Sequence, residues 1–154
     1  MKAKAIALTL PLFFAFVAFG FADSPQLGTW KLNEAKSKIP AGSPKNSTVV
    51  YEAAGDQIKV TVDGVDAQGQ PAHSEWTGKF DGKDYPVTGD PTSDTRSYRQ
   101  INSRTLSLTA KKGGKVTLTG RIVVSANGKS RTVTTNSTNA NGKKVTVVAV
   151  YDKQ

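Results

Sequence analysis

The sequence predicts an all-β domain, a single antiparallel up-and-down (meander) β-barrel of about ten strands with one short helix after the first strand. Apolar and polar residues alternate with a period of two along most of the chain, for example over 58–63, which is typical of strands with one buried face. Glycine dipeptides that favour tight hairpin turns separate these runs, at 81–82, 113–114, 127–128 and 141–142. Such short turns indicate that each strand pairs with its neighbour in the chain.

The alternation and the turns place ten strands in order. We expect them over 27–32, 46–54, 57–64, 71–80, 84–88, 95–101, 104–112, 115–125, 130–138 and 143–152. The strand at 130–138 has Val133 as its only aliphatic residue, but its Thr and Ser residues still favour extended backbone. Between the first two strands, residues 33–40 predict a short helix that Asn33 caps and Pro40 ends.

The arrangement of these strands has two solutions. Consecutive antiparallel strands with tight connections either stack as two sheets or close into a barrel. A barrel removes the free edges that would otherwise pair with other chains. The near-uniform hairpin order favours the barrel, and a Greek-key sandwich is the alternative.

The first 22 residues predict a cleavable signal peptide. Lys2 and Lys4 precede an apolar run over 5–19, and Gly20 and Ala22 place small residues at the two positions that a signal peptidase recognises. Cleavage there leaves one domain, 23–154, which is long enough to bury a core. We expect a periplasmic or secreted protein with no stable membrane insertion. An uncleaved membrane anchor is the alternative. Because the chain has no Cys, disulfides and a lipoprotein anchor are excluded.

The charge balance has two interpretations. The chain carries a net charge of +9, or +7 without the two lysines of the signal. A basic domain attracts anionic partners such as acidic glycans, lipopolysaccharide headgroups or nucleic acid. Five lysines flank glycine turns, however, where they keep strand edges soluble: Lys112, Lys115, Lys129, Lys143 and Lys144. We favour this solubilising role, and the lack of a basic stripe interleaved with aromatic residues disfavours nucleic acid.

No complete catalytic or metal-binding motif is present in the sequence. His73 is the only histidine; it shares a strand face with Glu75, whereas Ser74 points to the opposite face. Without Cys or a second His, the usual zinc sites cannot be built. We therefore expect a protein that is not an enzyme, with no catalytic residue, no metal and no cofactor.

The tripeptide Gly28-Thr29-Trp30 at the start of the first strand resembles the Gly-x-Trp signature of the lipocalin and fatty-acid-binding-protein superfamily. The segments 28–38 and 148–153 also resemble small exported bacterial proteins described as lipocalin-like. The resemblance implies barrel closure: Gly28 lets the first strand bend, and Trp30 plugs one end of the barrel beneath a basic side chain from a late strand. Arg121 and Arg131 are both candidates for that side chain.

Several aromatic residues are candidates for lining a ligand cavity. We define the aromatic set as Tyr51, Trp76, Phe80, Tyr85 and Tyr98. Such rings line apolar pockets with hydroxyl handles, and they also serve as core filler. Arg96 is the sixth candidate: facing inward with Tyr98 and Gln100, it would hold an anionic headgroup. We expect these three residues on a solvated face instead.

Two functions follow. The favoured one is an exported, non-enzymatic binding protein that holds a small hydrophobic or amphipathic ligand in a barrel cavity of at least about 300 Å³, lined by the aromatic set. The alternative is a structural or interaction protein of the cell envelope. It would have a filled core, no ligand and an exposed surface patch instead.

Overall fold

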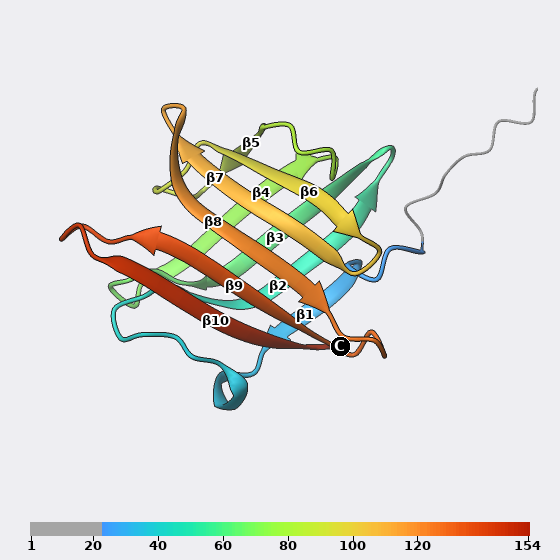
Figure 1. The fold of residues 1–154 in the computed structure, drawn as a ribbon, viewed down its shortest axis with the longest axis horizontal. Helices are drawn as coiled ribbons and strands as arrows, with labels where there is room; N and C mark the ends of the chain where they lie inside the picture. Colours follow the sequence, from blue (N-terminus) through green and yellow to red (C-terminus); the bar gives the residue numbers. More distant parts are fainter. Residues whose placement is uncertain (1–22) are drawn as a thin grey trace, which may run out of the picture.

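In a computed structural model, which describes residues 23–154, ten antiparallel strands form one closed barrel (Figure 1). The strand order is β1-β10-β9-β8-β7-β6-β5-β4-β3-β2, so each strand pairs with its neighbours in the chain and the first pairs with the last. The predicted meander barrel is confirmed, and the sandwich alternative is excluded. The predicted signal peptide at 1–22 lies outside the described residues.

The strands agree closely with the alternation in the sequence, since no boundary differs from its predicted position by more than two residues. They are β1 (Gly28–Leu32), β2 (Lys45–Ala54), β3 (Gln57–Val65), β4 (Pro71–Gly78), β5 (Tyr85–Thr88), β6 (Thr95–Asn102), β7 (Thr105–Lys112), β8 (Lys115–Val124), β9 (Ser130–Thr138) and β10 (Lys144–Lys153).

The expected helix over 33–40 is confined to one 3-10 turn, η2 (Glu34–Lys36). Asn33 caps the turn as predicted, because its side-chain oxygen accepts a hydrogen bond from the Lys36 amide at 3.2 Å. The chain then returns to extended backbone, and Lys38 forms an antiparallel bridge with Val148. This long-range pairing ends the helix earlier than local sequence preference indicates.

The barrel closes through a short seam between β1 and β10. Only Trp30, Lys31 and Leu32 of β1 pair with β10, opposite Lys153, Asp152 and Tyr151. Backbone hydrogen bonds from the segment after β1 extend the seam: the Asn33 amide donates to Val150 and the Lys38 amide to Val148. The seam therefore depends on the turn η2 as well as on the strands.

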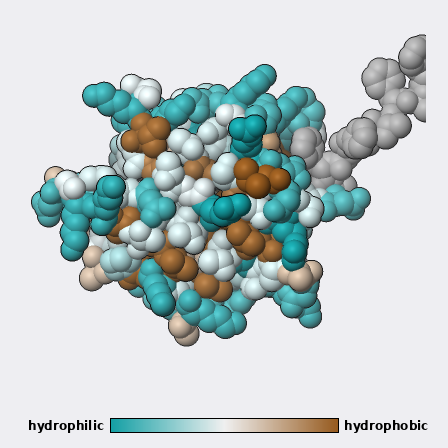
Figure 2. All heavy atoms as spheres, in the orientation of Figure 1, coloured by the Kyte–Doolittle hydropathy of each residue, from teal (hydrophilic) through white to brown (hydrophobic). Residues whose placement is uncertain are grey.

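Apolar side chains from the inward faces of the strands form a continuous core, with Trp30, Ile58, Val60, Trp76 and Leu106 almost fully buried. In the view of Figure 1, β7 to β10 lie in front of β2 to β4. The outer face presented there is mainly polar, and apolar residues reach it only in small separate patches (Figure 2). The barrel thus has a packed apolar interior and, on the face shown, a mainly polar outer surface.

Candidate functional site

One end of the barrel is closed by Trp30 together with Arg131. The Trp30 side chain is fully buried, and its indole nitrogen donates to the Gln26 carbonyl at 2.9 Å. Gly28 has a φ of +117°, and a Cβ at this position would lie 2.8 Å from Cε of Lys153. The positive φ and the close approach of Lys153 both favour glycine there.

Of the two candidates, Arg131 lies over Trp30, and Arg121 is instead exposed on the outside of β8. Lys153 of β10 is a second cation over this ring, with its Nζ 5.2 Å from the centroid. The Arg131 guanidinium carbon lies 4.8 Å from the Trp30 ring centroid, 4.7 Å from that of Tyr51 and 5.2 Å from that of Tyr151. Its Nε and Nη1 atoms have no hydrogen-bond acceptor among residues 23–154. Three aromatic rings therefore lie against this buried cation in positions that allow cation–π contacts.

The phenols beside Arg131 are held in their neutral form. Burial raises the pKa of Tyr151 to about 12, and the charge of Arg131 only partly opposes that rise. Burial likewise raises the pKa of Tyr51 well above its ordinary value. Neither phenol is therefore a candidate proton donor or acceptor near neutral pH.

The aromatic set forms one packed cluster. The Trp76 ring centroid lies 4.7 Å from that of Tyr98 and 5.7 Å from that of Tyr85, both edge-on. Phe80 lies 5.9 Å from Tyr98 and 6.4 Å from Tyr51. These distances are those of rings in direct contact. The five residues grouped from the sequence do lie together in the structure. Their rings pack against one another in this part of the interior.

Arg96 and Tyr98 face inward, which differs from the expected solvated face. Both lie opposite inward-facing residues of β7, and Tyr98 is 2% exposed. Gln100, two residues further along β6, is exposed. The guanidinium of Arg96 is already paired, because its Nη2 atom lies 3.0 Å from Oδ2 of Asp90. Arg96 is therefore not a free anion-binding group.

Asp90 is fixed for this pairing by the loop before β6. Its carboxylate accepts hydrogen bonds from the Thr92 amide at 2.8 Å and from the hydroxyl groups of Thr92 and Ser93. Burial alone would raise the pKa of Asp90, but these hydrogen bonds and the charge of Arg96 hold it below its ordinary value. The Arg96–Asp90 ion pair therefore holds this loop against the inward face of β6.

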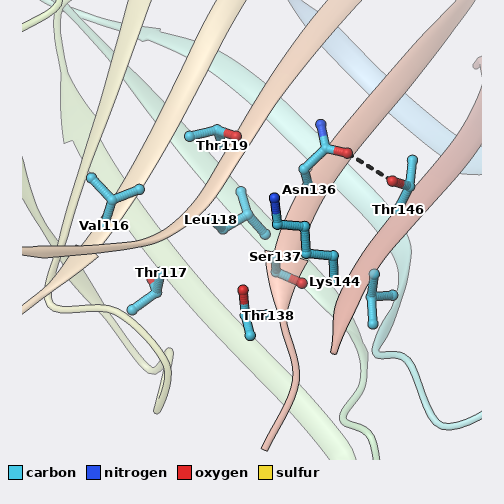
Figure 3. A pocket seen from close by; sticks show the side chains of 10 residues that line it. Val116, Thr117, Leu118, Thr119, Asn136, Ser137, Thr138, Lys144 and Thr146 are labelled. Atoms are coloured by element: carbon cyan, nitrogen blue, oxygen red, sulfur yellow. Dashed lines mark hydrogen bonds between the residues drawn. The ribbon is translucent and has the colours of Figure 1, made fainter. Parts of the chain in front are cut away.

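A hollow of about 340 Å³ lies at the rim of the barrel (Figure 3). We call it the rim hollow; it is lined by residues 116–119 of β8, 136–138 of β9 and 144–146 of β10. Its volume matches the expected cavity, but its lining does not. No member of the aromatic set lines this hollow.

A bulge in β8 accounts for the rim hollow. Ala110 pairs with Leu118 but Lys111 pairs with Val116, so Thr117 is an extra residue in β8. Pairing between β8 and β9 begins only at Leu118 opposite Ser137. Beyond that point the β7–β8 and β9–β10 hairpins separate, as Figure 1 also shows. The space between them is the rim hollow.

The lining of the rim hollow combines apolar, hydroxyl and cationic groups. Three side chains are aliphatic and five carry hydroxyls. Asn136 Oδ1 accepts a hydrogen bond from the Thr146 hydroxyl at 2.7 Å, and the Lys144 side chain extends over the hollow from β10 (Figure 3). Sequence reasoning missed this site because its residues are ordinary strand residues, and only the bulge separates the hairpins.

His73 lies on the outer face of the barrel between two carboxylates. Its Nδ1 lies 2.6 Å from Oδ1 of Asp63, and its Nε2 lies 3.5 Å from Oε1 of Glu75. The hydrogen bond to Asp63 raises the pKa of His73. Glu75 also pairs with Lys59 at 3.2 Å. Within residues 23–154, no group of three or more His, Asp or Glu side chains is arranged to hold a metal ion.

The comparisons with known proteins show no family for this chain. No family profile and no curated protein sequence matches this chain. Among solved structures, one redesigned β-barrel aligns at a TM-score of 0.44 and 12% identity, covering 85% of this chain and 93% of its own. Another, mFAP1 bound to DFHBI, aligns at 0.43 and 17%, covering 84% and 98%. Strand order and core define the chain as a small closed meander barrel. No helix in the described part is long and apolar enough to cross a membrane.

Proposed function

We propose that residues 23–154 are a non-enzymatic binding protein that is exported from the cytoplasm and recognises its partner on the outside of the barrel. The observation that carries this proposal is the packing of the aromatic set. Its rings contact one another where a carrier would keep space for a ligand, and Arg96 is paired with Asp90. The interior is then a scaffold, and recognition falls to the outer face and the rim.

The same proposal includes two further points: the protein is not an enzyme, and it belongs with the lipocalin-like barrels. His73 is exposed and held by Asp63, and the neighbouring Ser74 is buried on the other side of β4. This geometry supplies no nucleophile next to a base. The positive φ of Gly28 and the placement of Trp30 beneath Arg131 support a place among the lipocalin-like barrels.

The filled interior is tested with a fluorescent fatty acid, cis-parinaric acid, and with native mass spectrometry of protein from its own host. Trp30 and Trp76 are the only tryptophans in the chain and both are buried, so an interior ligand would quench their fluorescence. We expect no saturable quenching and no co-purified apolar molecule. Stoichiometric binding that quenches both tryptophans would restore the interior-carrier function.

Export is tested by the mass of the protein recovered from the periplasm of a bacterial host. We expect a chain that begins at Asp23, because the small residues Gly20 and Ala22 mark the cleavage site. Full-length protein retained in the cytoplasm or in the membrane fraction would contradict this part of the proposal.

A second candidate function is binding of a small amphipathic ligand in the rim hollow. Its volume of about 340 Å³ falls within the range of small-molecule sites, and its aliphatic and hydroxyl lining with one lysine suits a short acyl chain with an anionic head. Octanoate is the probe. We expect amide chemical-shift changes at 116–119 and 136–146 that are lost in Lys144→Glu and kept in Lys129→Glu, an exposed cation at the other end of the barrel. Changes centred on Trp76 would contradict it.

A further inference from the structure

The charges of this barrel are divided between its two halves. Residues 95–151, which form β6 to β9 and most of β10, contain eleven Lys and Arg and no Asp or Glu. Residues 23–94 contain seven Lys and Arg against eleven Asp and Glu, a net charge of −4. A balanced surface would interleave both signs. In this barrel, by contrast, every charged residue within a run of 57 consecutive residues is Lys or Arg.

Most of these cations are free to act on a partner. Three of the eleven have internal roles: Arg96 pairs with Asp90, Lys111 pairs with Asp84, and Arg131 is buried. The other eight are exposed, and none forms an ion pair within residues 23–154. Arg99 and Arg121 lie within strands, and the other six lie in or next to the hairpin turns at the two ends of the strands. By contrast, Lys45, Lys59 and Lys79 of the acidic half are all paired. We call the outer surface of β6 to β10 the basic face.

The register arranges the basic face in rows that cross the strands. In one row, Thr109, Thr119, Asn136 and Thr146 lie side by side from β7 to β10. In the adjacent row, Arg99, Ser107, Arg121 and Thr134 follow from β6 to β9. The two arginines are separated by one strand, which places their backbones about 10 Å apart. Hydroxyl and amide groups thus run beside two guanidinium groups, and at the Arg99 end the row borders Asp81 across an antiparallel bridge.

From these observations we propose that the basic face binds an acidic polysaccharide, a chain of sugar units that carry carboxylate or sulfate groups. Sugar hydroxyls both donate and accept hydrogen bonds, as Thr and Asn side chains do. Arginine recognises carboxylate and sulfate groups with paired donors. The spacing of about 4.8 Å between strands is close to the length of one sugar unit in an extended chain, so acidic units in alternation would meet Arg99 and Arg121.

Other polyanions fit this face less well. The segment 95–151 contains two aromatic residues, Tyr98 and Tyr151, and both are buried, so no ring is available to stack nucleic-acid bases. The large exposed apolar side chains, Ile101, Val116 and Val123, lie on separate strands or at separate levels and form no continuous surface for insertion into a membrane. The rim hollow opens at one end of this face beside Lys144 and offers space for a terminal sugar unit.

This inference rests on the proposed use of the outer surface, and its experiment leaves the test of the filled interior independent. The probe is polygalacturonate, with dextran as the uncharged reference, titrated by calorimetry at several NaCl concentrations. We expect saturable binding of polygalacturonate only, which weakens steadily as salt increases. If polygalacturonate did not bind while the interior bound no ligand, the proposed polysaccharide site would be refuted. The proposal of a filled interior would be unaffected.

The variants separate the basic face from net charge. Arg99→Gln, Arg121→Gln and Lys144→Gln combined remove three charges from the face, and Lys59→Gln, Lys79→Gln and Lys83→Gln combined remove three from the acidic half. We expect the first set to weaken binding at least about tenfold and to flatten the salt dependence, and the control set to change it less than about twofold.

Several outcomes would overturn the proposal. One is a control set that weakens polygalacturonate binding as much as the basic-face set does. Binding would then depend on net charge alone. Others are an absence of polygalacturonate binding in 50 mM NaCl, and tighter binding of duplex DNA or of vesicles containing phosphatidylglycerol at the same salt. Unchanged circular dichroism and thermal midpoints for both sets of variants would show that the differences arise from the surface.

Discussion

Replacement of Arg131 tests how the barrel end is held closed. The guanidinium carbon lies within 5.2 Å of the centroids of three rings, and the residue is 2% exposed. A cation over a ring contributes about 0.5–1 kcal/mol at exposed sites and about 2 kcal/mol when desolvated. Against this stands the cost of burying a charge whose Nε and Nη1 atoms have no acceptor in the described chain.

Two substitutions separate these terms. Arg131→Met keeps an apolar side chain of similar length but removes the charge, and we expect a loss of about 1–2 kcal/mol in the free energy of unfolding. Arg131→Ala also leaves a cavity beneath the rings, and we expect a loss of about 3–5 kcal/mol. Arg121→Met, on the exposed outer side of β8, is the control and should change stability by less than about 0.5 kcal/mol.

Urea unfolding, followed by the fluorescence of the two buried tryptophans, measures these differences. The dependence of the unfolding free energy on urea should stay constant, since the surface exposed on unfolding is nearly the same. If Arg131→Met were as stable as the parent protein or more stable, the buried cation would contribute nothing beyond its volume. The account of closure by Arg131 and three rings would then be refuted.

Three further predictions concern other positions. Gly78→Ala would place its Cβ 2.5 Å from Cγ of Tyr85, so we expect displaced rings and a loss of about 1–3 kcal/mol in urea unfolding; an unchanged near-ultraviolet spectrum would contradict this. Gly28→Ala, at a φ of +117°, should cost about 1–2 kcal/mol, and parental stability would show that β1 does not need that conformation. His73 should titrate above 6.5 by proton NMR, and Asp63→Asn should return its pKa toward 6.5. Because the folded pKa is raised, the pair stabilises fully below pH 6.5 and less as the pH rises through the folded pKa; an unchanged His73 titration in Asp63→Asn would exclude the pair as the cause.

The strands were predictable because alternation reports directly on which residues are buried. Ile58, Val60 and Val62 are buried and alternate with the more exposed polar residues Lys59, Thr61 and Asp63. The glycine dipeptides fix where several of the runs end. The helix over 33–40 was only partly predictable. Asn33 does cap a turn, but Lys38 instead bridges Val148, more than one hundred residues away in the chain. Local preferences contain no information about that partner.

The candidate site shows where sequence reasoning stops. It selected Trp76, Phe80 and Tyr98 for their chemistry, but whether such rings enclose a cavity depends on their mutual distances, which the barrel diameter sets. Arg96 was placed outside because arginine is usually solvated. It lies inside because Asp90, six residues earlier, supplies a fixed carboxylate at 3.0 Å. A short-range partner across an irregular loop leaves no periodic signal.

The meander topology explains why the charge division becomes a surface at all. In this barrel every strand lies beside its neighbours in the chain, so an acid-free segment such as 95–151 folds into one continuous wall. In a Greek-key sandwich the same segment would be divided between two sheets, and acidic strands would lie between the basic ones. The filled interior and the cationic wall therefore have a common origin in strand order. That order packs together the aromatic set, whose members come from β2, β4, β5, β6 and the segment after β4. It also collects the free cations outside, where a long anionic chain can reach several of them at once.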